Sequence, residues 1–439
     1  MEKKKETIVA IDIGTTKICA VAGRLNEYGK LEILGIGKSL SKGVSRGMVA
    51  NIDKTVESIK LAVEQLKSQV DIDFKKVYVG IAGEHIRCQQ QRGNIVRNNT
   101  EDEISRKDIE EMIKQMKKMP VPQGNLIIHV LPQEFIVDGE HFIKDPEGYP
   151  GTNLEANFHI ITGKATAAKN IQRCIVKSGL EVEDIILEPI ASAEAVLSEE
   201  EKEAGVVLVD IGGGSTDITI FKENIIRYTA VIPFGGEIVT SDIQQGCKLL
   251  KEHAEKLKLK FGSSLPVESF ENKVVSIPSL KGRPAKEISL KNLAGIINAR
   301  MEEIIHDVLF HIETANKDYP KTLIGGIVLT GGGAMLKNVK PHFEYITGMD
   351  ARIGLPNEHL AKSEVPNLQN PIYSTGIGLV LKGFEENKSE LEEEESEETL
   401  KTTENETIEP NVVLKEKKGL AKFWKSIKKW FEDGIENDF

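Results

Sequence analysis

Aromatic residues make up only 5% of this 439-residue chain, and its only two tryptophans, Trp424 and Trp430, lie close to its end. The nine histidines show neither HxxxH nor HExxH spacing. The four cysteines are far apart and include no CxxC pair: Cys19, Cys88, Cys174 and Cys247. This pattern argues against a metal site, a redox motif or a disulfide framework, and we expect buried, reduced thiols.

Long apolar runs are also missing. No stretch of about twenty apolar residues is present, so we expect no transmembrane helix, and no apolar stretch follows Met1–Lys5, so we expect no signal peptide. The formal net charge of −11 argues against a body that binds nucleic acid. The length predicts two or more domains, and 40% hydrophobic residues are enough for real cores. The expected location is the cytosol, free or attached to a membrane.

The negative charge is unevenly distributed. Residues 385–410 hold twelve acidic and two basic residues, whereas residues 415–433 hold seven basic and three acidic ones. A segment with high like charge and few apolar residues cannot offset the entropy of ordering, so residues 385–414 are predicted to be a disordered linker. An acidic helix lying on the body is the alternative.

Residues 415–433 are predicted to form an amphipathic helix. Apolar residues recur at helical spacing and share one face: Leu420, Phe423, Trp424, Ile427, Trp430 and Phe431. Lysines surround that face, which is typical of a helix that lies in the headgroup region of an anionic membrane. The segment is too short and too charged to span a bilayer. A C-terminal helix docked on the body is the alternative.

A glycine-rich turn occurs twice in the same context. Asp12-Ile13-Gly14-Thr15-Thr16-Lys17 and Asp210-Ile211-Gly212-Gly213-Gly214-Ser215-Thr216-Asp217 each follow an apolar run and precede a β-prone run. Strand, turn and strand make a hairpin, unlike the strand-to-helix layout of a P-loop or Rossmann site. Glycines let backbone N–H groups approach an anion closely. An aspartate beside a phosphate calls for a divalent cation between them, so two facing hairpins indicate a clamp for a Mg-nucleotide.

One such motif could be an ordinary glycine-containing β-turn. Two copies in the same context argue against that interpretation. A third glycine segment follows the apolar run that ends at Thr330: Gly331, Gly332 and Gly333, then Met335. Three glycines after a buried strand leave a flat surface suited to a nucleoside. We expect a helix over 336–345 behind it.

Together these motifs resemble the actin/Hsp70/hexokinase superfamily, and within it the FtsA family of bacterial cell-division actin homologues. The resemblance covers residues 6–384 and the C-terminal helix. Two further segments strengthen it: Leu187-Glu188-Pro189-Ile190-Ala191-Ser192-Ala193 and Gly376-Ile377-Gly378-Leu379. It implies an α/β, actin-like, two-lobed ATPase fold, with an inserted α+β subdomain and a C-terminal amphipathic helix on a disordered linker.

The resemblance assigns roles around an ATP and a Mg²⁺ ion. Asp12 and Asp210 would hold the metal, through its waters. The backbone of Gly14–Thr16 and of Gly212–Thr216 would hold the phosphates, with Lys17 reaching them as a point charge. Gly331–Gly333 and Met335 would contact the nucleoside. Opposite them, the remaining binding residues would be Gly236, Glu255 and Lys258, although residues 254–262 alone would be taken for an ordinary charged helix.

Turnover is expected to be slow at most. The resemblance gives Glu188 the position of the residue that orients the attacking water, while a carboxylate stabilised by a helix N-terminus is an equally good interpretation. Gly213 stands where actin has an acidic residue, which is consistent with a weakened ATPase.

The expected organisation follows the superfamily. Residues 6–85 and 164–204 form lobe 1 (subdomain 1A), and 86–163 form the insert (1C). Residues 205–234 and 305–384 form lobe 2 (2A), which carries subdomain 2B at 235–304. The repeated strand–hairpin–strand predicts two similar halves.

The function implied is an actin-like protein that polymerises and tethers the FtsZ ring to the cytoplasmic face of the membrane at the division site. Its partners would be other copies of itself, a C-terminal FtsZ peptide on 2B, further division proteins on 1C and an anionic membrane. Basic residues at the edge of 2B could meet such a peptide: Lys281, Arg283, Lys286 and Lys291. The alternatives are a PilM-type pilus-assembly homologue and, less well supported, a sugar kinase or exopolyphosphatase, for which no substrate base is evident.

Overall fold

Two five-stranded sheets with the same topology organise the molecule. In lobe 1 the order is β11-β6-β1-β2-β3, and in lobe 2 it is β14-β13-β12-β17-β18. Each begins with three antiparallel strands and adds two parallel ones. The repeat of this pattern confirms the expected pair of similar halves, and it places the two β1–β2-type turns at equivalent sites.

Lobe 1 contains β1 (Ile8–Ile13), β2 (Lys17–Leu25), β3 (Leu31–Leu40), β6 (Lys76–Ile81) and β11 (Glu181–Leu187). Helices α1 (Ile52–Lys67) and α3 (Ala165–Lys177) pack together with this sheet in one core. Asn51 caps α1 by accepting a hydrogen bond from the Lys54 N–H. A short hairpin of β4 (Val44–Ser45) and β5 (Met48–Val49) precedes α1.

Lobe 2 contains β12 (Val206–Ile211), β13 (Thr216–Lys222), β14 (Ile225–Ile232), β17 (Ile327–Thr330) and β18 (Ala351–Ile353). Its core includes the long helix α8 (Leu290–Ala315) and α10 (Val339–Thr347), with α9 (Tyr319–Thr322) beside α8. All six residues of β12 are buried, which fits a central strand covered on both faces.

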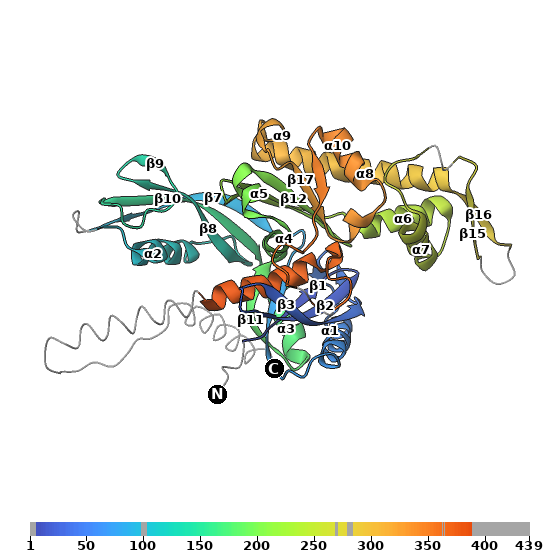
Figure 1. The fold of residues 1–439 in the computed structure, drawn as a ribbon, viewed down its shortest axis with the longest axis horizontal. Coiled ribbons are helices and arrows are strands. Elements are labelled where there is room, and N and C mark those ends of the chain that lie inside the picture. Colours follow the sequence, from blue (N-terminus) through green and yellow to red (C-terminus); the bar gives the residue numbers. More distant parts are fainter. Residues whose placement is uncertain are drawn as a thin grey trace. The chain divides into compact units, whose positions relative to one another are not determined.

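The insert has its own four-stranded sheet, in the order β7-β10-β8-β9, and its own core. The strands are β7 (Arg87–Val96), β8 (Asn125–Val137), β9 (Glu140–Ile143) and β10 (Asn153–Lys164), with α2 (Arg106–Lys117) along one face (Figure 1). Met112 and Met116 of α2 pack on Phe158 in this core. Ser105 is the N-cap of this helix, and its N–H donates to Asp108.

A smaller region of lobe 2 carries α6 (Gly236–Cys247), α7 (Lys251–Phe261) and a hairpin of β15 (Val274–Ile277) and β16 (Lys286–Ser289). Lys286 donates to the Cys247 carbonyl and Lys291 pairs with Glu271 at 2.9 Å, so both basic side chains already have partners.

The computed structural model describes residues 6–97, 103–267, 271–278, 284–361, 363 and 365–388. Lys281, Arg283 and the expected amphipathic helix at 415–433 lie outside these residues, as does most of the expected linker. The sequence analysis assigned residues 385–388 to that linker, but they form the last turn of a helix that spans residues 374–388. In the described part of the chain, no helix is both long enough and apolar enough to cross a membrane.

Two helices lie between the lobes. Helix α4 (Glu188–Val196) meets helix 374–388 so closely that a Cβ at Gly378 would lie 1.7 Å from the Ala191 carbonyl oxygen. Only glycine permits this approach of two backbones.

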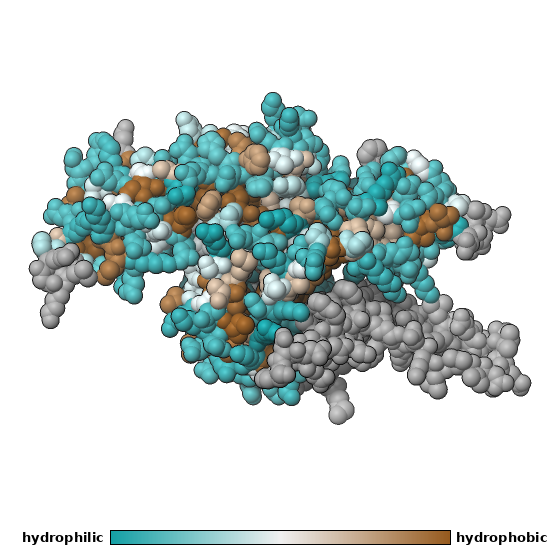
Figure 2. Space-filling model, turned by 180° about the vertical axis from the view of Figure 1, so that it is seen from behind, coloured by the Kyte–Doolittle hydropathy of each residue, from teal (hydrophilic) through white to brown (hydrophobic). Residues whose placement is uncertain are grey.

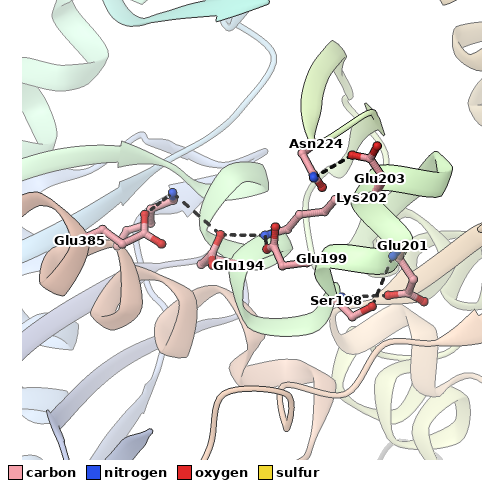
Figure 3. A network of polar contacts seen from close by, with 9 residues as sticks. Glu194, Ser198, Glu199, Glu201, Lys202, Glu203, Asn224 and Glu385 are labelled. Atoms are coloured by element: carbon pink, nitrogen blue, oxygen red, sulfur yellow. Dashed lines mark hydrogen bonds and ion pairs between the residues drawn. The ribbon is translucent and has the colours of Figure 1, made fainter. Parts of the chain in front are cut away.

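A polar network holds the far end of α4 against α5 (Glu199–Ala204) (Figure 3). The ammonium of Lys202, only 6% exposed, lies 3.2 Å from Glu194 and 2.8 Å from Glu199. Lys382 of helix 374–388 approaches Glu194 at 3.9 Å. Both helices between the lobes are therefore joined through the same carboxylate.

The surface outside these contacts is mixed. On the face shown in Figure 2, hydrophilic side chains predominate and apolar ones form several separate patches. Scattered exposed apolar residues of this kind are normal for a folded protein and need no special explanation.

Candidate functional site

The first hairpin places an aspartate and a lysine side by side. Asp12 near the end of β1 is 4% exposed, and Lys17 opens β2 after the turn of Gly14–Thr16. The Lys17 ammonium lies 2.5 Å from Asp12 Oδ2. Burial opposes the ammonium, but the charges of Asp12 and Asp210 outweigh it and raise the pKa of Lys17. Lys17 therefore neutralises Asp12 in this structure.

The second hairpin places Asp210 among hydroxyl donors. Ser192 of α4 donates to Asp210 Oδ2 at 2.7 Å, and Thr375 of helix 374–388 donates to the same oxygen at 3.4 Å. Burial raises the pKa of Asp210, the Ser192 hydrogen bond opposes this, and the charge of Asp12 adds to the increase. Both helices between the lobes thus meet at this carboxylate.

The two hairpins touch each other. A Cβ on Gly213 would lie 2.4 Å from Thr16 Cγ2, and one on Gly214 would lie 2.3 Å from Thr15 Oγ1. The two turns therefore meet through backbone and small side chains, with no room for anything larger. The facing arrangement expected from the sequence is present.

The triple-glycine loop packs against the second hairpin. Gly331 has φ = 80°, and a Cβ there would lie 2.2 Å from Asp210 Oδ1. A 3-10 helix follows at Gly332–Met335 and leaves the Met335 side chain 54% exposed. The helix expected at 336–345 begins at Val339 instead, because Asn338 adopts a left-handed conformation. The expectation was right about the element and wrong about where it starts.

Gly236, Glu255 and Lys258 come together on the α6 and α7 side. The Lys258 ammonium lies 2.8 Å from the Gly236 carbonyl oxygen, 2.8 Å from Thr240 Oγ1 and 2.8 Å from Glu255 Oε2. Thr240 also donates to Glu255. The network fixes the side chains of Glu255 and Lys258 of α7 on α6.

Two further carboxyl groups lie in the same region. Glu188 opens α4 and packs on Gly80 of β6. Burial, followed by the charges of Asp12, Asp217 and Asp210, raises the pKa of Glu188 well above its usual value. Burial and Asp210 raise the pKa of Asp217 to about 8. A helix N-terminus would lower a carboxyl pKa, so burial and crowding by other acids dominate here.

Every residue that the sequence analysis assigned to the site, except Thr216, lines one cavity of about 520 Å³, a size typical of small-ligand sites. The cavity also includes residues that the sequence analysis did not assign to the site: Lys38, Asp217, Leu259, Gly262, Met301, Leu336, Lys337, Asn370, Pro371, Ile372 and Thr375. Asp217 belongs to a motif already quoted and could have been proposed from it. No sequence motif marks Asn370–Ile372 and Thr375 as site residues, apart from their position before the Gly376 segment.

Across the described residues, no three histidine, cysteine or acidic side chains converge in a way that would ligate a metal directly. Buried carboxyl groups at Asp12, Asp210 and Asp217, together with the partly exposed Glu188, nevertheless give the cavity an acidic floor opposed chiefly by Lys17. Glycine turns without room for a side chain adjoin that floor. This combination fits an anion that brings its own cation.

Two lobes of equal topology, each contributing a glycine-rich hairpin to one acidic cavity, define an actin-like ATPase fold. One chain of the PilM–PilN type IV pilus biogenesis complex superposes with a TM-score of 0.64 at 16% identity, covering 86% of this chain and 98% of that one. MreB5 of Spiroplasma citri bound to ADP gives a TM-score of 0.52 at 14% identity, covering 88% and 98%. At these identities the likeness establishes the fold.

Sequence comparison identifies the family. The model "Cell division protein FtsA" matches residues 207–378, and the model "SHS2 domain inserted in FTSA" matches residues 83–162. The Pseudomonas aeruginosa cell division protein FtsA is 38% identical, with 86% of this chain and 89% of that protein aligned. The Escherichia coli K12 protein of the same name is 32% identical over 87% and 91%. The chain belongs to the FtsA family and is a cell-division homologue of actin.

Proposed function

We propose that the cavity binds ATP with Mg²⁺. Asp12 and Asp210 would hold the cation, chiefly through its waters, because Mg²⁺ gives up its hydration shell reluctantly. The N–H groups of Gly14–Thr16 and Gly212–Thr216 would hold the phosphates. Gly331–Gly333 and Met335 would face the nucleoside, with Gly236, Glu255 and Lys258 on its other side.

One observation carries this proposal: both hairpins and the triple-glycine loop line a single cavity with an acidic floor. MreB5, which shares the fold, has been solved bound to ADP and to AMPPNP. The Lys17–Asp12 pair supports the proposal too, because an arriving cation could take over Asp12 and free Lys17 for the phosphates.

Turnover, where it occurs, is proposed to be slow. Glu188 lines the cavity and would orient the attacking water. Burial and neighbouring acids raise the pKa of Glu188, and a cation bound nearby would oppose this increase and favour the carboxylate form, which accepts a hydrogen bond from water. Gly213, which has no room for a side chain, contributes only its backbone.

In the cell, we propose that the protein polymerises on the cytoplasmic face of the membrane at the division site, tethers the FtsZ ring there and recruits later division proteins. The helix proposed at 415–433 would be the membrane contact, residues 86–163 would serve self-association and recruitment, and residues 235–304 would take the C-terminal FtsZ peptide. The subdomain boundaries are those given from the sequence.

Flotation with anionic vesicles tests the membrane role. Full-length protein is expected to float and to carry FtsZ with it, whereas Trp424→Glu with Trp430→Glu should stay in solution and still bind MgATP. The matched control, Trp424→Phe with Trp430→Phe, keeps the apolar face and should float. If the glutamate variant floated like wild type, the membrane proposal would be wrong.

Binding of a C-terminal FtsZ peptide tests the 2B assignment. Fluorescence anisotropy should detect binding to wild-type protein, and Lys291→Glu should weaken it, because this lysine lies at the edge of the region. Lys177→Glu in lobe 1 serves as the control for a general loss of positive charge. Equal weakening by both variants would remove the support for a specific site on 2B.

A further inference from the structure

Strand β14 joins two regions that are far apart in the sequence. It is the edge strand of the lobe 2 sheet: one of its edges pairs with β13, and the other pairs with no further strand in the described part of the chain. An unpaired strand edge is usually protected by some other part of the protein. Here the insert of lobe 1 provides the protection.

Each of the three long strands of the insert places one side chain against β14. Cys88 of β7 donates to the Thr229 carbonyl at 3.0 Å. His159 of β10 lies 3.1 Å from Thr229 Oγ1, and Gln133 of β8 donates to the Ile226 carbonyl at 2.5 Å. His159 and Thr229 are 1% and 4% exposed. This contact, called the β14 junction below, links the insert directly to the other lobe.

The segment that follows β14 contacts the second hairpin turn, which lines the candidate nucleotide cavity. Thr216 of the second hairpin donates to the Phe234 carbonyl at 2.8 Å, and the Gly236 N–H donates to the Gly212 carbonyl at 2.9 Å. A Cβ on Gly235 would lie between 2.6 and 2.9 Å from three carbonyl oxygens of the second hairpin turn. The chain that leaves β14 is therefore fixed to the turn that would hold phosphates.

The path contains buried polar atoms without a protein partner. Among the described residues, these include His159 Nδ1 at the β14 junction and Asp217 Oδ1 at the cavity. Asp217 on β13 pairs in register with Val231 on β14, two residues from Thr229. An unsatisfied buried polar atom raises the free energy of the arrangement that contains it. A ligand or a rearrangement that satisfied these atoms would recover part of that free energy.

We propose that the insert responds to the state of the nucleotide cavity through β14, so that ligand binding at the second hairpin changes the β14 junction. Because coupling between two sites is reciprocal, a partner that holds the insert in one arrangement changes nucleotide affinity by the same factor. This inference rests on the proposed nucleotide binding and goes beyond it.

A change at the β14 junction would alter a surface groove to which a partner could bind. A polar groove of about 350 Å³ borders the β14 junction and is lined by β7, β8, β10 and β14. Arg92 comes from the insert and Arg227 from β14, so a shift of one relative to the other changes the shape of the groove.

Cys88 is a natural reporter of the β14 junction. It is half-buried, whereas Cys19, Cys174 and Cys247 are buried. In the full-length protein, saturating MgATP should slow labelling of Cys88 by a maleimide about fivefold, in the usual range of allosteric couplings. Calorimetric titration of the same sample reports binding itself. No binding would refute the proposed function, whereas binding with labelling unchanged within twofold would refute the coupling.

A matched pair of variants tests the route. Thr229→Val removes the hydroxyl that meets His159 and keeps the β-branched shape, so the effect of MgATP on Cys88 labelling should fall below twofold. Thr219→Val makes the same change at the residue paired with Thr229 on β13, whose hydroxyl has no partner, and should keep the full effect. If both variants behaved alike, β14 would not be the route.

Discussion

The two glycine-rich hairpins have the same strand–turn–strand geometry and carry their negative charge in different ways. In the first, Asp12 pairs in register with Cys19 and has the Lys17 ammonium at 2.5 Å. In the second, Asp210 pairs in register with a second acid, Asp217, and its hydrogen-bond donors are neutral hydroxyls. The first hairpin supplies its own counter-charge. In the second hairpin, the negative charge must be neutralised by protons or by a bound cation. We therefore expect the second hairpin to respond to pH and to ligand.

The largest effect is expected from Asp217→Asn in the absence of nucleotide. The Asp217 carboxyl has a pKa of about 8 when folded against an ordinary value of 3.8, so between these values the unfolded chain binds fewer protons. Wild-type stability must therefore fall as pH rises through this window. The asparagine variant should lack this loss, on the order of 3 kcal/mol between pH 5 and 8.

Urea unfolding at several pH values measures the difference between the two proteins. The free energies of unfolding should be similar near pH 4 and should separate as pH rises, with the variant the more stable. Parallel profiles over the whole range would contradict the charge imbalance proposed for the second hairpin.

Lys17→Met should destabilise the nucleotide-free protein by about 2 kcal/mol, because it leaves the buried Asp12 carboxylate without its cation. The value lies below that of a fully buried pair, since the Lys17 side chain is 20% exposed. Lys177→Met is the control: the Lys177–Asp53 pair is largely exposed and its loss should cost less than about 0.5 kcal/mol. Equal costs in urea unfolding would remove the distinction between the two ion pairs.

Asp210→Ala should weaken MgATP binding about tenfold or more, equivalent to about 1.4 kcal/mol, because one of the two carboxylates proposed to hold the cation is lost. Isothermal titration calorimetry with MgATP measures it. The matched comparison is Asp242→Ala, which removes a carboxylate of lobe 2 that pairs with Arg300 and does not line the cavity. An affinity equal to that of wild type would exclude the two-hairpin clamp.

The smallest effect is expected at Cys19, which holds in the first hairpin the register position that Asp217 holds in the second. Burial raises the pKa of the Cys19 thiol to about 11, so it stays neutral below pH 9. Cys19→Ala should cost about 1 kcal/mol through lost packing, with a pH profile parallel to wild type between pH 5 and 8. A profile that flattened as in Asp217→Asn would show that the pH response does not originate in the second hairpin.

The sequence predicted those parts of the site whose structure depends on consecutive residues. A buried strand followed by a glycine turn specifies its own hairpin, so Gly14–Thr16, Gly212–Ser215 and Gly331–Gly333 could be located without coordinates. Ser192 and Thr375 could not be connected with Asp210, because both come from helices placed by tertiary packing. The start of α10 was misjudged because apolar spacing does not reveal the left-handed conformation of Asn338.

Contacts between the domains could not be predicted from the sequence either. The insert could be predicted as a separate α+β unit from the family resemblance. Its contact with β14 depends on Cys88, Gln133 and His159, one from each of three strands, meeting a strand about seventy residues or more further along the chain. Single side chains of this kind have no periodicity from which a contact could be inferred.

The close approach of Gly378 to Ala191 has a practical consequence for protein engineering. An α-helix turns by about 100° per residue, so one residue inserted ahead of Gly378 in helix 374–388 would rotate the glycine away and turn a bulky neighbour toward the Ala191 carbonyl. Thr375, close to the start of that helix, would keep its place beside Asp210 while everything after the insertion changed orientation. A fluorescent protein or affinity tag is therefore best joined after residue 388. A fusion there leaves the residues of helix 374–388 in their present orientation between the two lobes.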